Sequence, residues 1–440
     1  MSHQPFPFAA HSPLAGPIPG RRTEELTLSV PLVHHDPSRG EIDVFARIVT
    51  AEGGNERPFL IFLQGGPGNE APRPLDGGPV WLDPVLQHYR VILLDQRGTG
   101  RSTPVGLDLP LPGSAGEHHP TWRDAIEADP AAAAEQLTHL RADEIVNDCE
   151  AVRRHLGAET VSLLGQSFGG FTSLRYLAAH PESLAEVMVT GGIPAVERSP
   201  KEVYAETWRV MREKSEAFYR RFPGDRQRMR ELLDHAAAGE IRLPNRDMVS
   251  PERLRTIGIQ LGRSGGAEAL HWLLGLDHRS DAFRHDLYAA LPFTGRNPLY
   301  AVFHESCQAN GHVTDWAAER AMPEDVRADL TLLGGEHIHR GLFDEDSELA
   351  PWKPVAEILA EHPWGPLYEA DDLRGCEVPA AAAVYFHDAF VPAVQSLETA
   401  ALMPGLMPWV TSEYEHNGLR AGGTAVIEHL LELVHGKRVS

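Results

Sequence analysis

The chain has 440 residues, 42% of them hydrophobic, and its 62 Asp and Glu against 40 Lys and Arg give a formal charge of -22. This length favours one large domain with an insertion over a string of small modules. The acidic balance argues against nucleic acid and anionic membranes as partners. No apolar run approaches the roughly 18 to 20 residues of a membrane span, and the first residues do not resemble a secretory signal, so we expect a cytoplasmic protein.

The chain begins with two segments in which apolar and polar residues alternate, 24–33 and 41–49. They are separated by a polar turn and predict an antiparallel hairpin at the edge of a sheet. Further along, the apolar runs are continuous, which is typical of parallel strands buried on both faces. These runs are 59–63, 91–94, 161–164, 187–190 and 380–386.

Helical patterns lie between and after these runs. Residues 101–142 are rich in Pro and Ala and predict a long loop with one helix, and an amphipathic helix follows at 143–156. The last apolar run, 406–410, precedes a polar loop and a closing helix at 424–434. We therefore predict an α/β fold, with a mostly parallel sheet and helices on both faces.

A long insertion interrupts the alternation of strands and helices. From about residue 194 to 373 the sequence is rich in helix formers and charges and has no buried-strand run of comparable quality. This pattern predicts a mainly helical cap domain, residues 194–373, between two parts of the core, residues 1–193 and 374–440.

A serine between two glycines follows the run 161–164 and precedes an amphipathic segment. Gly165-Gln166-Ser167-Phe168-Gly169 has the strand before and the helix after that a nucleophile elbow requires, which makes Ser167 the candidate nucleophile. The alternative is a plain serine in a glycine-rich turn. In such an elbow the N–H of Phe168 is one oxyanion donor. The second would come from Gln64-Gly65-Gly66-Pro67-Gly68, after run 59–63, with Gly66 favoured and Gly65 next.

A nucleophilic serine also needs a base and an acid, which in this architecture follow it in the order acid, then histidine. Asp388 directly follows run 380–386, and His416 lies between the last apolar run and the closing helix. Glu377 is the nearest rival acid, but it precedes its strand. The three cysteines, Cys149, Cys307 and Cys376, are too widely spaced to indicate a disulfide framework or a metal knuckle. We expect no metal and no cofactor.

These motifs resemble the proline iminopeptidases of the α/β-hydrolase superfamily. Residues 64–68 are similar to the family's His-Gly-Gly-Pro-Gly oxyanion motif, with Gln64 in place of histidine, and residues 95–102 (DQRGTGRS) match the family signature. Ser167, Asp388 and His416 fall in the family's order. The resemblance implies an α/β-hydrolase core in which Ser167 forms an acyl-enzyme. Asp95, Arg97 and Arg101 of the signature are expected to hold the oxyanion loop through buried ion pairs and hydrogen bonds.

The resemblance extends into the insertion. Phe303-His304-Glu305, residues 314–320 and Gly334-Gly335-Glu336-His337 are similar to the longer-chain branch of these peptidases. In the family, cap glutamates hold the free imino group of an N-terminal proline, and Glu305 and Glu336 are the matching positions. The resemblance therefore implies an aminopeptidase whose partners are small peptides with N-terminal proline.

Two alternatives stay open at this stage. An esterase or amidase would keep the core and use the cap for another substrate, and the two glutamates distinguish it from the aminopeptidase. A non-catalytic binding protein on a hydrolase scaffold is the other, and the intact Ser167, Asp388 and His416 argue against it.

Overall fold

The computed structural model describes residues 18, 20–113 and 119–438, and its centre is an eight-stranded sheet in the order β1-β2-β4-β3-β5-β6-β7-β8. The predicted hairpin is confirmed: β1 (Arg21–Pro31) and β2 (Glu41–Ala51) pair antiparallel at one edge. β2 also pairs antiparallel with β4, and the remaining pairs are parallel. The other strands are β3 (Phe59–Leu63), β4 (Arg90–Leu94), β5 (Val161–Gln166), β6 (Leu184–Thr190), β7 (Ala380–Tyr385) and β8 (Leu406–Thr411).

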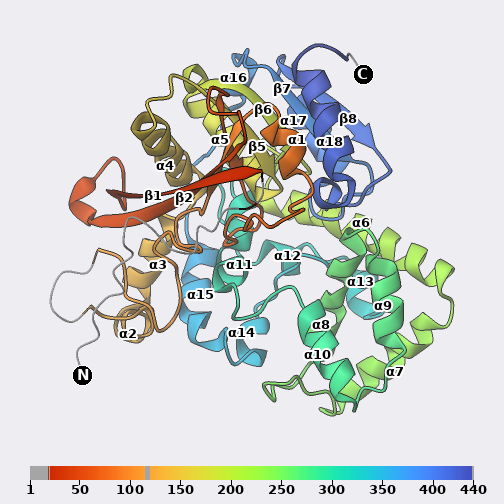
Figure 1. The fold of residues 1–440 in the computed structure, drawn as a ribbon. Helices are drawn as coiled ribbons and strands as arrows, with labels where there is room; N and C mark the ends of the chain where they lie inside the picture. Colours follow the sequence, from red (N-terminus) through yellow and green to blue (C-terminus); the bar gives the residue numbers. More distant parts are fainter. Residues whose placement is uncertain (1–17, 19, 114–118, 439–440) are drawn as a thin grey trace.

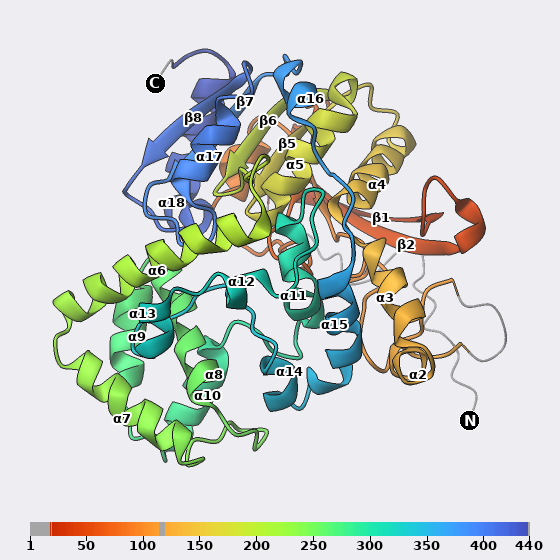
Figure 2. The same ribbon diagram turned by 180° about the vertical axis from the view of Figure 1, so that it is seen from behind.

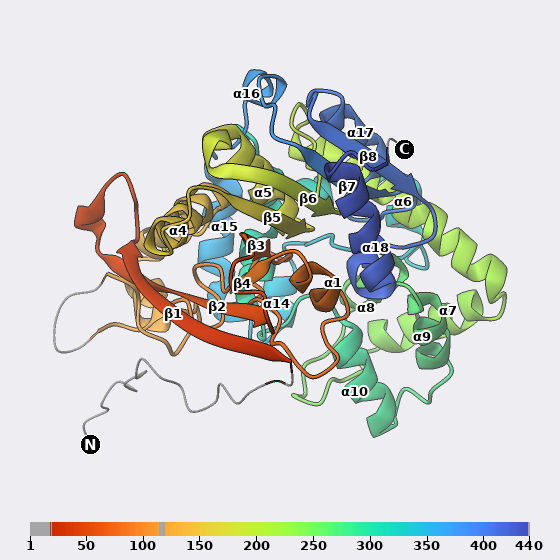
Figure 3. The ribbon, with the colours of Figure 1, turned by 45° about the horizontal axis from the view of Figure 1, so that its top comes forward.

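The continuous apolar strands are explained by helices on both faces of the sheet. Ile61 and Leu63 of β3 belong to a hydrophobic cluster with α4 (Ala142–His155), α5 (Phe168–Ala179) and α17 (Ala393–Ala400). Leu60 and Phe62 belong to a second cluster with α1 (Leu82–Leu86) and α18 (Gly418–Val434). Because successive side chains of a strand point to opposite faces, both faces of β3 need apolar side chains, which explains its continuous apolar run. Figure 3 shows α4 and α5 on one side of the strands, with α1 and α18 on the other.

The insertion between β6 and β7 is helical, as predicted. Figure 1 shows it as a body below the sheet, and Figure 2 shows the long helix α6 running along the boundary between this cap and the core. Its helices are α6 (Pro200–Arg221), α7 (Asp225–Ala237), α8 (Pro251–Arg255), α9 (Gly266–Leu274), α10 (Asp281–Ala290), α11 (Pro298–Phe303), α12 (Ala317–Arg320), α13 (Glu324–Ala328), α14 (Leu342–Glu345), α15 (Lys353–Glu361) and α16 (Ala370–Arg374). Short 3-10 helices complete the list: η1 (Pro37–Arg39), η2 (Pro181–Ser183), η3 (Thr256–Gly262), η4 (His304–Gln308) and η5 (Ala350–Trp352).

The segment 101–142 contains two helices where the sequence predicted one. α2 (Trp122–Ala128) and α3 (Pro130–Thr138) are separated by Asp129, whose carboxylate accepts the N–H of Ala131 and of Ala132. A capping aspartate followed by proline ends one helix and begins the next. Both helices pack on the cap, where the ring of Trp122 lies 5.8 Å from that of Trp352. The bounds of the cap, residues 194–373, stay a prediction.

The closing helix begins earlier than predicted and is kinked. α18 starts at Gly418, and at Gly423 the backbone leaves the helical region, with φ 43° and ψ -111°. The predicted start at residue 424 therefore corresponds to the part of α18 after the kink. The first part, Gly418 to Gly422, follows His416 directly and fixes the position of its loop.

The three cysteines lie in the interior of the protein. Cys149, Cys307 and Cys376 are all buried and free. Among the described residues, no helix combines the length and the hydrophobicity that crossing a membrane requires.

Candidate functional site

Ser167 stands at the turn between β5 and α5 in a backbone conformation that few residues adopt. Its φ of 56° and ψ of -123° place it at a sharp strand-to-helix turn. A Cβ on Gly169 would come within 1.9 Å of the carbonyl oxygen of Leu63, and one on Gly165 within 2.5 Å of the carbonyl oxygen of Gly169. Only glycine allows strand and helix to approach this closely. The flanking glycines therefore permit a strained turn that exposes the hydroxyl at the carboxyl end of the sheet.

The structure brings the three predicted triad residues together. Nε2 of His416 lies 2.9 Å from Oγ of Ser167, and Nδ1 lies 2.7 Å from Oδ2 of Asp388. The other carboxylate oxygen of Asp388 accepts the N–H groups of Phe390 and Val391 at 2.9 and 3.0 Å. This arrangement leaves Nδ1–H donating to the acid and Nε2 facing the hydroxyl, the tautomer that a general base needs.

The surroundings of His416 set its affinity for a proton. Burial of the ring lowers its pKa, but the charge of Asp388 and the hydrogen bond to it act in the opposite direction and prevail. Glu336 adds a further increase and Arg420 a decrease. The pKa of His416 therefore lies above its ordinary value of 6.5, which makes the ring a stronger base.

Three backbone N–H groups near Ser167 have no acceptor among the described residues: those of Phe168, Gly65 and Gly66. A Cβ on Gly65 would lie 2.9 Å from Cβ of Ser167, whereas the nearest atoms to one on Gly66 belong to Gly68 and Asn69. Gly65, which the sequence ranked behind Gly66, is thus the glycine in contact with the serine. Free N–H groups beside a serine hydroxyl can stabilise an oxyanion.

The signature residues 95–102 support the loop that carries these glycines. Asp95 accepts the N–H of Ala71 at 3.0 Å and that of Arg101 at 2.9 Å, which joins the end of the oxyanion loop to the signature loop. Arg97 forms a buried bidentate pair with Asp148, with distances of 2.7 and 2.6 Å. These hydrogen bonds and ion pairs join Asp95 and Arg97 to residues outside the triad, in agreement with the structural role expected for the signature charges.

The cap covers the triad through several contacts with core loops. Nδ2 of Asn297 donates to the carbonyl oxygen of Pro67 at 3.0 Å, and Lys214 pairs with Glu415, the residue before His416. Ser167 is 9% exposed and His416 8%. The cap and the core loops together therefore bury both side chains almost completely.

Glu336 lies next to the triad inside the cap. Its neighbour Gly335 packs against the ring of Phe390, which lies 5.1 Å from the ring of His416. The hydroxyl of Tyr300 donates to Oε1 of Glu336, and Nε2 of His304 lies 3.8 Å from Oε2.

Aromatic rings surround this carboxylate. The ring of His304 lies 5.1 Å from that of Tyr300 and 6.5 Å from that of Tyr204. The Tyr204 hydroxyl and Nδ1 of His304 are buried and have no hydrogen-bond partner among the described residues. A carboxylate with aromatic faces and unused polar atoms suits a small organic cation. The sequence predicted no role for Tyr204 or Tyr300, because single residues in a helical insertion carry no recognisable pattern. His304 stood there only as part of the motif before Glu305.

Glu305 makes backbone contacts that the sequence did not predict. Its two carboxylate oxygens accept the N–H groups of Ala317 and Ala318, at 3.0 and 2.8 Å, and thereby cap the start of α12. Burial raises the pKa of Glu305 to about 7, although both backbone hydrogen bonds oppose this. The sequence shows a glutamate at the family's position but not the backbone donors that the fold places against it. Backbone donors thus occupy both carboxylate oxygens of Glu305, whereas side chains hold Glu336; that the two glutamates bind a substrate amine stays a prediction.

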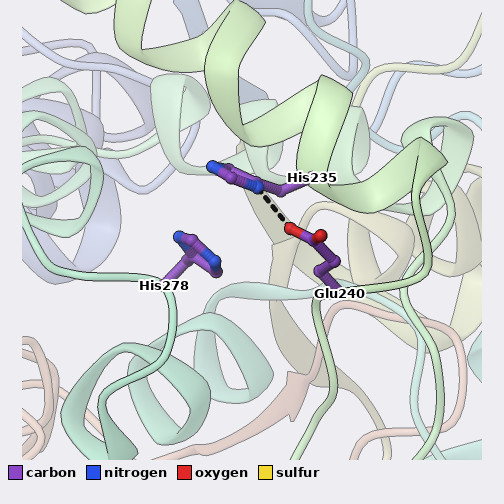
Figure 4. A group of neighbouring side chains, drawn as sticks. All are labelled: His235, Glu240 and His278. Carbon is purple, nitrogen blue, oxygen red and sulfur yellow. Dashed lines mark hydrogen bonds and ion pairs between the residues drawn. The ribbon is translucent and has the colours of Figure 1, made fainter.

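A separate group of possible metal ligands lies on the outer part of the cap (Figure 4). His235 at the end of α7, Glu240 and His278 each offer a ligand atom within 4.8 Å of the others. Nδ1 of His235 is already 2.6 Å from Glu240, and the rings of His235 and His278 stack with centroids 3.9 Å apart. Imidazole binds a metal through the ring-plane lone pair of its nitrogen, so stacked rings must turn before both ligate one ion. In this arrangement the group is a hydrogen-bonded surface cluster.

Comparison with known proteins identifies the class. Residues 58–236 match the family model of the alpha/beta hydrolase fold, and with the sheet order and the elbow this makes the chain an α/β hydrolase. It is 38% identical over 441 aligned residues to a proline iminopeptidase of Aeromonas sobria, covering 96% of this chain and 99% of the relative. It is 30% identical to a proline iminopeptidase of Aspergillus aculeatus, over 94% of each chain. The chain therefore belongs to the proline iminopeptidase family.

The extent of these matches also identifies the branch. A proline iminopeptidase of Neisseria gonorrhoeae is 28% identical over only 34% of this chain and 38% of its own. The Aeromonas relative, in contrast, matches through the cap. The resemblance to the longer-chain branch is thus confirmed.

Proposed function

We propose that this protein is a serine aminopeptidase that releases N-terminal proline from peptides. The observation that carries the proposal is the Glu336 carboxylate, set among aromatic rings beside the hydrogen-bonded series Ser167–His416–Asp388. Two full-length relatives named proline iminopeptidase support it. The predicted cytoplasmic location stays a prediction.

The proposed reaction starts with acylation. Nε2 of His416 takes the proton of Ser167 Oγ as the oxygen attacks the prolyl carbonyl, and Asp388 stabilises the imidazolium that forms. The N–H groups of Phe168 and Gly65 hold the negative charge of the tetrahedral intermediate. His416 then passes the proton to the leaving amine, and the C–N bond breaks.

Deacylation repeats these steps with water. His416 takes a proton from the water molecule that attacks the acyl-enzyme and returns it to Oγ of Ser167, which frees proline. The protons balance over the cycle, so these residues complete the hydrolysis without a cofactor.

Substrate selection follows from the cap. A protonated imino group needs a carboxylate partner when it leaves water, and Glu336 supplies one. The rings of Tyr204, Tyr300 and His304 offer apolar faces to the pyrrolidine ring. Because the charged imino group and the scissile carbonyl belong to the same residue, fixing the imino group brings only the first peptide bond to Ser167.

A substrate panel tests this proposal. We expect kcat/KM for prolyl-naphthylamide to exceed that for alanyl- and leucyl-naphthylamide by at least about tenfold, since one missing contact in such a pocket changes rates by this order. Simple esters such as p-nitrophenyl acetate should react without dependence on Glu336. If esters and all aminoacyl substrates reacted equally well, the esterase or amidase alternative would be right.

A further inference from the structure

Two arginines beside the histidine loop have no anionic partner among the residues that the structure describes. Arg420 lies in the first turn of α18, where its N–H donates to the carbonyl oxygen of Asn417 at 2.9 Å. Arg263 lies in the cap, at the end of η3 and before α9. Both residues are exposed, and no hydrogen bond or ion pair joins either guanidinium to another described residue. Partial desolvation and the charge of Arg263 lower the pKa of Arg420, as expected for two neighbouring cations.

This pairing is unusual in a chain with a formal charge of -22. Other cations at the boundary between cap and core do have partners: Lys214 pairs with Glu415, and Arg296 lies 2.6 Å from Glu70. Two like charges side by side repel each other, which is energetically unfavourable. A neighbouring carboxylate would offset this repulsion. In the described part of this acidic chain no carboxylate pairs with either arginine, which is the arrangement of a site that receives an anion from solution.

The two arginines flank one contact between cap and core. The residue after Arg263, Ser264, donates from its N–H and its hydroxyl to Oδ1 of Asn417, at 3.0 and 3.2 Å. The residue before Arg263, Gly262, packs directly on the ring of Phe390. Asn417 follows His416, and Phe390 contacts it. The pair therefore lies beside the His416 loop. The charge of Arg420 acts to lower the pKa of the His416 ring, and the charge of Arg263 acts to lower that of Tyr300.

The path of the proton in the proposed reaction indicates which part of the substrate lies near the two arginines. His416 gives its proton to the leaving amine, so the departing peptide must lie next to the imidazole. Proline faces Glu336 at the other end of the scissile bond. The departing part of a short peptide ends in a carboxylate. Each residue of this part moves the carboxylate at most about 3.3 to 3.6 Å further from the scissile bond.

We propose that Arg263 and Arg420 form a subsite for the free C-terminal carboxylate of short peptides, so that di- and tripeptides with N-terminal proline are the preferred substrates. This subsite rests on the aminopeptidase function proposed above. Guanidinium groups suit it, because they bind carboxylates through paired, charge-assisted hydrogen bonds. Glu336 and the arginine pair then recognise the two charged ends of one small substrate.

Matched substrates test the subsite. The measured quantity is the ratio of kcat/KM for Pro-Gly-Gly to that for its C-terminal amide, which cancels any general change in activity. We expect a ratio of about ten or more in the native enzyme at low salt, since a charge-assisted hydrogen bond is of this strength. The ratio should fall towards one in the double variant Arg263→Gln, Arg420→Gln, and should decrease as salt rises.

Two further variants serve as controls. The double variant Arg263→Lys, Arg420→Lys keeps both charges and should retain part of the preference. Arg230→Gln removes an exposed arginine from α7, at the end of the cap away from the sheet (Figure 1), and should keep the native ratio. Circular dichroism verifies that each variant is folded.

The outcomes separate the subsite from the function on which it rests. Equal use of the acid and the amide by the native enzyme, or an unchanged ratio in the double glutamine variant, would overturn the subsite while prolyl-naphthylamide turnover upheld the aminopeptidase. A native enzyme without prolyl-naphthylamide turnover would overturn both.

Discussion

In the core, the three triad side chains stand at the carboxyl ends of β5, β7 and β8. In the cap, Glu336 comes from a loop, and its aromatic neighbours come from the long helix α6, the short helix α11 and the 3-10 helix η4. The core positions its residues through backbone contacts that only glycine permits, such as that of Gly169 against Leu63. The cap positions its carboxylate through side chains, chiefly Tyr300 and His304. Side chains can be substituted more readily than the backbone at strand ends. A core of this kind can therefore keep its hydrolytic chemistry while substitutions in the cap change the substrate.

The largest effect is expected in the core. Ser167→Ala removes the nucleophile and should lower kcat/KM for prolyl-naphthylamide by at least about 10⁴-fold. Adding His416→Ala should cost little more, because the two residues act as one unit. Steady-state kinetics measures both, and labelling by a fluorophosphonate should be lost in parallel. A Ser167→Ala enzyme with a tenth of native activity would refute the nucleophile assignment.

The cap should respond more moderately. Glu336→Gln keeps the shape of the side chain but removes the charge that we propose binds the imino group. We expect kcat/KM for prolyl-naphthylamide to fall by about 100-fold, because the free energy of one charge-assisted hydrogen bond corresponds to a factor of this order. Glu357→Gln, which removes a surface carboxylate paired with Arg340, is the matched control and should change little. Equal kinetics in the two variants would contradict amine binding by Glu336.

The pH profile should reveal the link between Asp388 and His416. His416 acts as a base only when it is neutral, and its pKa lies above 6.5. We therefore expect kcat/KM to decline once the pH falls below this pKa, and to decline about tenfold per pH unit at the acidic end of the profile. Asp388→Asn removes the charge that raises this pKa and should move the acidic limb to lower pH while reducing the maximal rate. An acidic limb that stayed in place in Asp388→Asn would show that another group controls it.

The smallest kinetic effect is expected at Glu305. In Glu305→Gln an amide N–H₂ faces one of the two backbone donors, so the free energy of unfolding should fall by about 1 to 3 kcal/mol. The raised pKa of about 7 adds a pH dependence. Native Glu305 contributes stability below the ordinary pKa of 4.5 that is lost as pH rises through 7, so the gap to the variant should narrow from pH 5 to pH 8.

Urea unfolding at several pH values measures this gap, and kinetics of the same variant provides the contrast with Glu336. If Glu305→Gln kept native stability but lost activity as Glu336→Gln does, the amine contact predicted from the sequence would be correct and the capping role wrong.

Much of the core was predictable from the sequence, because local patterns determine it. Continuous apolar runs correctly located five strands, and the glycines around Ser167 located the turn. Asp388 and His416 could be selected because chain order and strand ends restrict where a triad is built.

The cap was predictable only as a helical insertion. The two glutamates looked equivalent in sequence, yet α12 directs two backbone donors at Glu305 and none at Glu336. The second helix in 101–142 was missed because a capping aspartate next to a proline looks like a loop. The contacts of Glu305 join segments that are distant in the sequence, and such contacts leave no local pattern from which they could be predicted.

The central claim is that the core hydrolyses while Glu336 in the cap selects a free N-terminal imino group. The most direct test compares kcat/KM for prolyl-naphthylamide and N-acetylprolyl-naphthylamide in the native enzyme and in Glu336→Gln. We predict that the native enzyme prefers the free imino group by at least about 100-fold and that this preference falls to a few-fold in the variant. Comparable hydrolysis of the blocked and free substrates by the native enzyme would contradict the account.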